Sequence, residues 1–138
     1  MTAYLIVRAD VEESSRKKFD HWYETEHLPG AIRDFKATSA MRGWSEVEPS
    51  IHLAFYEFPD LTAANNLLTS DLMKEFIKEF DRHWAGTVTR TREVFEVKQL
   101  LKKISKITGQ NAYSSRVTLE VQNLLIVLSK ISPRLTAK

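Results

Sequence analysis

The sequence contains no cysteine, which excludes disulfide bonds, a thiol nucleophile and a thiolate-bound metal. It has 4 glycines among 138 residues, and neither a G-x-G-x-x-G motif nor a P-loop occurs. A glycine-rich loop that cradles nucleotide phosphates is therefore not expected. The sequence also lacks the motif that surrounds a serine nucleophile, so hydrolysis by a serine-based triad is disfavoured.

Long hydrophobic runs are missing as well. The start, "MTAYLIVRADVEE", has a short apolar run followed by acidic residues, and this run is too short for a signal peptide. The longest apolar run near the other end, "LLIVL", is far shorter than the ~20 residues that span a bilayer. We therefore expect a cytoplasmic protein without a membrane partner.

Histidine spacing gives little support to a metal site. None of the 4 histidines forms an H-x-H or H-x-x-x-H pair with another, and H-E-x-x-H is absent. A metal would therefore need ligands that the fold brings together from distant positions: His21, His27, His52 and His83. We predict neither a metal nor a cofactor.

The charges divide the chain into two parts. Residues 1–98 carry 13 Lys/Arg and 17 Asp/Glu, whereas residues 99–138 carry 7 Lys/Arg and one acid, Glu120. We therefore predict one domain over 1–98, followed by a basic C-terminal extension over 99–138. Nucleic-acid binding is not expected, because Tyr113 is the one aromatic residue among the basic residues of the extension.

Apolar runs rich in β-branched residues predict four strands, at residues 3–9, 36–47, 51–58 and 86–100. Two helical patterns lie between them, one after the first strand and one after the third. The order β-α-β-β-α-β favours an α+β fold, the ferredoxin-like sandwich, in which one four-stranded sheet carries two helices on one face.

Capping signals predict where the helices begin and end. Asp10 and Glu13 have the spacing of a capping box, which predicts a helix from there to about His27 that ends at Pro29-Gly30. In the second helical pattern, Thr69-Ser70-Asp71 has the composition of a new cap, which allows the helix to stop and restart there.

The extension has apolar residues at helical spacing on both sides of the loop-like "TGQNAYSS". A helical hairpin fits this pattern, and "RVTLEV" equally fits a strand. The extension is then a packing element with a solvated basic face, a contact for acidic partners, or an addition foreign to the domain.

The segment "FDHWYETEHLPG", residues 19–30, concentrates aromatic, histidine and acidic side chains. On a helix with 100° per residue, Phe19, Trp22 and Tyr23 share the buried arc, Glu26 falls within that arc, and His27 lies at its edge. A buried carboxylate needs a partner or a cavity. The alternative is that these two residues cap the helix end or lie half-exposed without a further role.

The longer segment "FDHWYETEHLPGAI" resembles the W-Y-x-x-E-H-x-P signature of the EthD-type group, which belongs to the dimeric α+β barrel superfamily. The resemblance covers roughly residues 2–98, including "DRHW" and "TRTREVFEV" near the end. It implies a ferredoxin-like protomer whose sheet packs against the sheet of a second protomer. It also implies a small pocket between helices and sheet into which Trp22 and His27 point.

The relatives that this resemblance implies include cofactor-free monooxygenases, lactone isomerases and proteins of unknown activity. With such a pocket, His27 is the candidate for proton transfer, because histidine is the side chain best suited to moving a proton at pH 7. Glu26 would orient His27 or hold a raised pKa in an apolar pocket. Trp22 and Tyr23 would form aromatic walls for a planar organic ligand.

Four further residues are candidates for substrate binding. His52 shares a strand face with apolar residues and is either a hydrogen-bonded core histidine or a second pocket group. Trp44 is a candidate pocket residue that also fits the core or an interface. Arg90 and Arg92 lie on one face of the last strand, where they either clamp a carboxylate or enolate or form solvated or cross-strand pairs.

Three functional hypotheses follow. The first is a small homodimeric, cofactor-free enzyme that binds a small organic substrate, aromatic or carbonyl, and acts through His27 as an isomerase, lyase or monooxygenase. The second is a non-catalytic ligand-binding or accessory protein of the same fold. The third is an interaction module whose functional part is the extension.

The strand at 51–58 has apolar residues on both faces, so a partner sheet or the extension must cover the face without helices.

Overall fold

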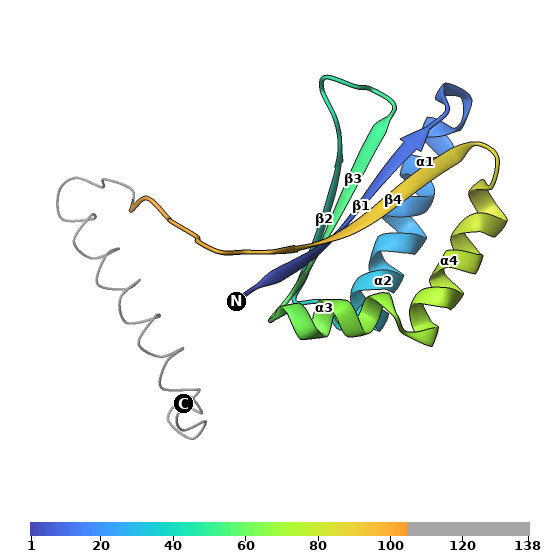
Figure 1. Cartoon of the computed structure of the whole chain (residues 1–138). Coiled ribbons are helices and arrows are strands. Elements are labelled where there is room, and N and C mark those ends of the chain that lie inside the picture. Colours follow the sequence, from blue (N-terminus) through green and yellow to red (C-terminus); the bar gives the residue numbers. More distant parts are fainter. Residues whose placement is uncertain (105–138) are drawn as a thin grey trace, which may run out of the picture. The chain divides into compact units, whose positions relative to one another are not determined.

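The computed structural model of the chain describes residues 1–104, and a compact unit spans Met1–Leu100 (Figure 1). The elements follow the predicted β-α-β-β-α-β order, with each predicted helix divided into shorter segments. Their bounds are β1 (Ala3–Val11), η1 (Glu13–Ser15), α1 (Arg16–Trp22), η2 (Tyr23–His27), α2 (Leu28–Phe35), β2 (Ser39–Trp44), β3 (Ile51–Phe58), α3 (Leu61–Leu68), α4 (Asp71–Trp84) and β4 (Val88–Glu96).

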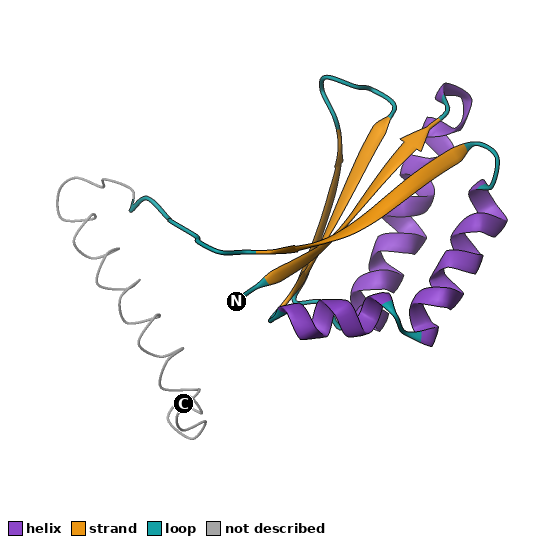
Figure 2. Cartoon of the chain, in the orientation of Figure 1, coloured by secondary structure: helices purple, strands orange, loops and turns teal. Residues whose placement is uncertain are grey.

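The four strands form one antiparallel sheet in the order β2-β3-β1-β4, and the helices cover one face of it (Figure 2). In the central strand β1, Val7 pairs with Ala54 of β3 on one side and with Arg92 of β4 on the other. Alternate residues of β1 are buried under the helices, as expected for a sheet with one covered face. The predicted ferredoxin-like α+β fold is confirmed.

The predicted helix stop at Pro29-Gly30 is wrong. The helical segment continues through α2 to Phe35 and ends where Lys36 adopts a left-handed conformation with φ of 56°. Just before α2, residues Tyr23–His27 form a π-helical turn, in which hydrogen bonds reach one residue further than in an α-helix. Pro29 therefore lies in the first turn of α2, where the missing N–H of a proline is tolerated.

The predicted caps have different outcomes. The Asp10 capping box is wrong, because Asp10 belongs to β1 and pairs with residues of both neighbouring strands. The predicted restart is confirmed, because the Ser70 side chain accepts a hydrogen bond of 3.1 Å from the backbone N–H of Met73 at the start of α4. In the same way, Asp60 caps α3 by accepting a 2.8 Å hydrogen bond from the N–H of Ala63.

The core on the helix face is built around one phenylalanine. Phe19 of α1 is fully buried, and the rings that surround it have centroids 5.2 to 6.4 Å from its own. These rings come from helices and strands far apart in the sequence: Trp22, Tyr23, Trp44, His52, Phe80 and Trp84. Edge-to-face contacts of this kind add to the stabilisation from burial alone. The cluster thereby fixes α1 and α4 against the sheet.

Most of the basic extension lies outside the described residues, and so do the helical hairpin and the strand predicted for it. The described part, residues 99–104, contains neither helix nor strand. The domain boundary at 98 therefore stays a prediction. Within residues 1–104, no helix is both long enough and apolar enough to cross a membrane.

Candidate functional site

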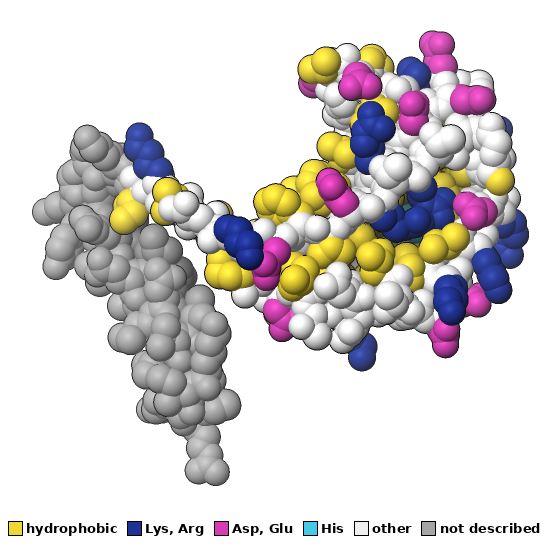
Figure 3. Space-filling model, viewed as in Figure 1, with side chains coloured by type: hydrophobic (Ala, Val, Ile, Leu, Met, Phe, Trp, Pro, Cys, Tyr) yellow, Lys and Arg dark blue, Asp and Glu magenta, His cyan; other side chains and the backbone are white. Residues whose placement is uncertain are grey.

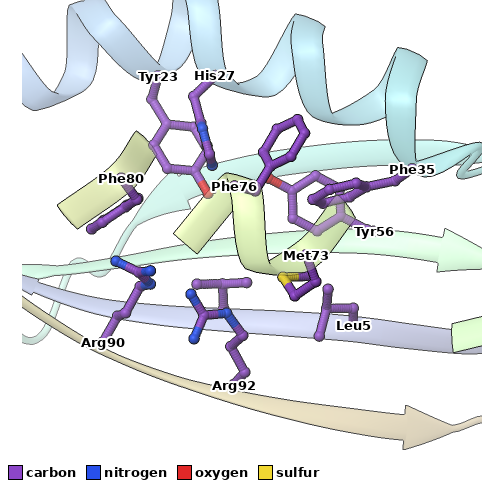
Figure 4. A pocket seen from close by; sticks show the side chains of 11 residues that line it. Leu5, Tyr23, His27, Phe35, Tyr56, Met73, Phe76, Phe80, Arg90 and Arg92 are labelled. Atoms are coloured by element: carbon purple, nitrogen blue, oxygen red, sulfur yellow. Dashed lines mark hydrogen bonds between the residues drawn. The ribbon is translucent and has the colours of Figure 1, made fainter. Parts of the chain in front are cut away.

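A cavity lies between the helical layer and the sheet, close to the π-helical turn. Tyr23 and His27 reach into it from the helical side, and Arg90 and Arg92 reach toward them from β4 (Figure 4). Apolar and aromatic side chains complete the lining: Leu5, Val7, Phe35, Tyr56, Met73, Phe76 and Phe80. The cavity thus combines an apolar wall with a few converging polar groups, as ligand sites generally do.

The cavity is small in this structure. Its volume is about 20 Å³, measured as the room available to the centre of a water molecule. A single water needs roughly 10–15 Å³ in the same measure. On the surface, Lys or Arg side chains lie inside a hollow between β4 and α4, bordered by hydrophobic side chains (Figure 3). An organic ligand therefore requires lining side chains to move, and Met73 is the most adaptable of them.

His27 faces this cavity among aromatic rings. Its ring stacks on Trp22 with a centroid distance of 4.5 Å and meets the edge of Tyr23 at 4.7 Å. No group in residues 1–104 forms a hydrogen bond with the ring. Burial, together with the positive charges of Arg90 and Arg92, lowers the pKa of His27 to about 3. The imidazole is therefore neutral at pH 7.

Arg90 and Arg92 place positive charge at the cavity. The Arg90 side chain is 8% exposed, its guanidinium carbon lies 3.7 Å from the centroid of the Phe80 ring, and its Nη1 donates to Asp81 at 3.1 Å. The buried Nε–H of Arg90 has no acceptor among the described residues. Burial lowers the pKa of both arginines, and the negative charge of Asp81 acts on both pKa values in the opposite direction.

Two tyrosine hydroxyls meet at the cavity wall. Tyr23 Oη and Tyr56 Oη are 3.2 Å apart, so one of them donates a hydrogen bond to the other. Burial raises the pKa of Tyr23 to about 12 and that of Tyr56 well above its ordinary value. Both phenols are therefore neutral at pH 7. Because one hydroxyl donates to the other, the proton of the accepting hydroxyl is left to donate elsewhere.

The predicted inward orientation of Glu26 is wrong. Glu26 is exposed and does not line the cavity. The prediction assumed 100° between successive residues, whereas the π-helical turn at Tyr23–His27 is wider and rotates later side chains around the axis. Trp22 is buried but lies behind His27, where it supports the imidazole by stacking instead of lining the cavity.

His52 and Trp44 belong to a separate polar network. Asp20 Oδ1 accepts hydrogen bonds of 2.8 Å from both Arg42 Nη1 and Trp44 Nε1, and Arg42 Nη1 also donates to His52 Nε2 at 3.3 Å. Neither His52 nor Trp44 lines the cavity, but the His52 ring packs 4.5 Å from the Tyr23 ring. The network therefore supports the cavity wall from behind.

The charges of this network fix its protonation states. The hydrogen bond from Arg42 is the largest cause that lowers the pKa of Asp20, and the one from Trp44 acts in the same direction. His52 is 1% exposed, and burial together with Arg42 lowers its pKa to about 4. At pH 7 the network therefore contains an ionised carboxylate, a guanidinium and a neutral imidazole.

Several cavity residues were not predicted from the sequence. Phe76 and Phe80 follow each other at a spacing of four, which equally describes a core helix face. Tyr56 lies on the same face of β3 as His52, because side chains alternate between the two faces of a strand. This alternation was the available signal for the orientation of Tyr56. Within residues 1–104, no three His, Asp or Glu side chains lie close enough together to hold a metal ion.

No protein-family model matches the sequence, and no curated protein matches it either. Among the solved structures that resemble it is a putative antibiotic biosynthesis monooxygenase from Deinococcus radiodurans, with a TM-score of 0.57 and 12% identity. An ethyl tert-butyl ether d (ethd) family protein from Bacillus halodurans c-125 has a TM-score of 0.55 and 16% identity. A conserved protein of unknown function, possible oxidoreductase, from Bacteroides thetaiotaomicron VPI-5482 has a TM-score of 0.53 and 11% identity. The matches cover 75%, 70% and 70% of this chain and 99%, 99% and 97% of those chains, in that order.

At such low identities, these matches describe the fold. The chain has a ferredoxin-like fold, which it shares with these structures, and its predicted likeness to an EthD-type protein is confirmed at the level of the fold.

The lowered pKa values of His27 and His52 predict a loss of stability in acid. Below pH 6.5 the unfolded chain binds protons at these histidines while the folded chain does not, so the free energy of unfolding falls as the pH decreases. Each histidine contributes about 1.4 kcal/mol per pH unit in this range. His27→Gln should therefore reduce the slope of stability against pH between about pH 6.5 and 5.

Urea denaturation at a series of pH values measures this slope. The matched control is His21→Gln, which changes an exposed histidine of α1. Equal slopes for the wild type and His27→Gln would show that His27 does not remain neutral in the folded protein.

Proposed function

We propose that the protein is an enzyme that binds a small organic carbonyl compound in this cavity and uses His27 to move a proton. One observation carries the proposal. A neutral imidazole, without a hydrogen-bond partner among the described residues, faces a cavity into which two guanidinium groups point from the opposite side. The imidazole is available to accept a proton, and the guanidinium groups are placed to stabilise the anion that results.

The proton transfer has a defined course. The neutral His27 ring takes a proton from a carbon next to the substrate carbonyl, the C–H bond breaks, and its electron pair moves to the carbonyl oxygen. The resulting enolate oxygen accepts hydrogen bonds from Arg90 or Arg92. In a substrate with a double bond between the β- and γ-carbons, the negative charge also reaches the γ-carbon; the imidazolium returns the proton there, the double bond moves to the α- and β-carbons, and the net reaction is an isomerisation.

The comparisons agree with a role in small-molecule chemistry. One similar structure is described as a putative antibiotic biosynthesis monooxygenase and another as a possible oxidoreductase. Those descriptions concern other proteins. They support this proposal to the extent that the fold accommodates a small-molecule site between its sheet and helices.

A non-catalytic ligand-binding protein is the second candidate, and the low pKa of His27 is the observation that favours it. An imidazole with a pKa of about 3 is a weak base. In a binding protein, His27 would only donate or accept a hydrogen bond. The two candidates therefore differ in whether a proton leaves the ligand.

Exchange of carbon-bound hydrogen in D₂O tests the proposal even while the substrate is unidentified. The wild-type protein should accelerate deuterium incorporation next to the carbonyl of at least one compound in a panel of small ketones and keto acids, followed by NMR. His27→Gln keeps hydrogen-bonding capacity but is a far weaker base, and it should lose roughly 100-fold or more of the exchange rate. His21→Gln is the matched control and should retain it.

Wild-type exchange rates in His27→Gln would remove His27 from the mechanism. Binding of a panel compound by both proteins, without exchange in either, would favour the non-catalytic candidate.

We further propose that two copies of the chain pair through the face of the sheet that carries no helices. This face holds a hollow of about 330 Å³ lined by apolar side chains alone: Tyr4, Ile6, Met41, Phe55 and Phe95. Met41 is 58% exposed and Phe95 is 53% exposed. Contiguous exposed apolar surface of this kind is typical of an interface.

Charge introduced on this face should separate the copies. Phe95→Glu and Met41→Glu should each shift the protein from dimer to monomer in light scattering coupled to gel filtration, because an unpaired carboxylate is costly in an apolar interface. Val47→Glu, at a residue exposed in the loop after β2, is the matched control. A wild-type protein that is monomeric at micromolar concentration would contradict the pairing.

A further inference from the structure

The cavity wall carries more positive than negative charge. Arg90 and Arg92 both point into the cavity from β4, and the carboxylate that acts on both of them is that of Asp81. Asp81 is exposed and pairs directly with Arg90 alone. With the tyrosines and His27 neutral at pH 7, two guanidinium charges and one carboxylate charge leave an excess of one positive charge beside the cavity.

The hydrogen-bond donors at the cavity are also in excess. The Arg90 Nε–H is buried and has no acceptor among the described residues. A buried donor without an acceptor is destabilising, and more so when it is charged. Buried donors nearly always have a partner, so the Arg90 Nε–H indicates an acceptor from outside this part of the chain, such as a water molecule or a ligand.

We propose that Arg90 and Arg92 form a subsite for the carboxylate group of a small substrate. The inference rests on the proposed function, because it assigns the chemistry of the substrate on which His27 acts. A carboxylate has the single negative charge that balances the excess, and its two oxygens match the planar fork of a guanidinium.

A phosphate group fits this site less well. At pH 7 it carries roughly 1.5 to 2 negative charges and three oxygens that seek donors. The cavity lining offers two guanidinium groups and a tyrosine hydroxyl, and its other side chains are apolar except for His27. The balance of charge therefore favours a monoanion.

Binding of a carboxylate changes the neighbouring base. The charged or titratable groups that act on His27 come from β4, β3 and α4: Arg90, Arg92, His52 and His83. The two arginines oppose protonation of His27, and a bound carboxylate cancels part of their field. The pKa of His27 therefore rises when the substrate binds. The substrate thus makes His27 a better base at the moment when the base is needed.

Calorimetric titration of the full chain with acetate and benzoate tests the subsite, and acetamide and benzamide serve as neutral analogues of matched shape. At least one carboxylate should bind roughly 10-fold or more tightly than its amide, as expected when hydrogen bonds to a charged group are lost. Arg92→Gln should weaken carboxylate binding by a similar factor, whereas Arg92→Lys should retain part of the affinity. Arg33→Gln, at an exposed arginine of α2, is the matched control and should bind as the wild type does.

Titrations in buffers with different ionisation enthalpies add a second readout. At pH 5, closer to the pKa of His27, the wild type should take up more protons per bound carboxylate than His27→Gln does. Equal affinity for the amide and the carboxylate, unchanged affinity in Arg92→Gln, or no binding of either carboxylate would overturn the subsite.

These results are separable from those of the proposed function. Carboxylate binding that depends on Arg92, without hydrogen exchange at any panel compound, supports the subsite and contradicts the enzyme. Exchange of a keto acid that depends on His27 but not on Arg92 supports the enzyme and overturns the subsite.

Discussion

The site depends on the burial of two arginines opposite a neutral imidazole. Arg90 is held against the Phe80 ring and anchored by Asp81, so its charge stays at the cavity instead of reaching solvent. Burial, together with this charge, keeps His27 unprotonated. The arginines therefore add to the effect of burial on the histidine, and they place positive charge opposite it.

The rest of the fold holds these groups in position. Tyr23 and His27 are four positions apart, about one turn of the π-helical segment, and both therefore face the cavity. Trp22 stacks behind His27, and the hydrogen-bonded network of Asp20 and His52 packs behind Tyr23. A helix with these functions cannot be replaced by one that merely packs, which explains the unusual composition of residues 19–30.

Periodicity in the sequence predicted the order of the elements and the ferredoxin-like sheet, because strands and helices with one buried face have distinct repeats. It failed where the backbone departs from the regular helix. After the π-helical turn the helix continues through Pro29, and the wider turn leaves Glu26 on the outside. A prediction that assumes 100° between successive residues cannot include either effect. The placement of Arg90 and Arg92 on one face followed from alternation along β4, but the lack of an acceptor for the Arg90 Nε–H depends on contacts between distant elements.

The most direct test of this account is the protonation state of His27 itself. Nitrogen-15 NMR of the labelled imidazole between pH 4 and 8 would follow it in the free protein. The account predicts that the ring remains neutral through this range, because its pKa lies at about 3. A ring that takes up a proton near pH 6.5 would show that neither burial nor the arginines act on it, and the account of the site would then be wrong.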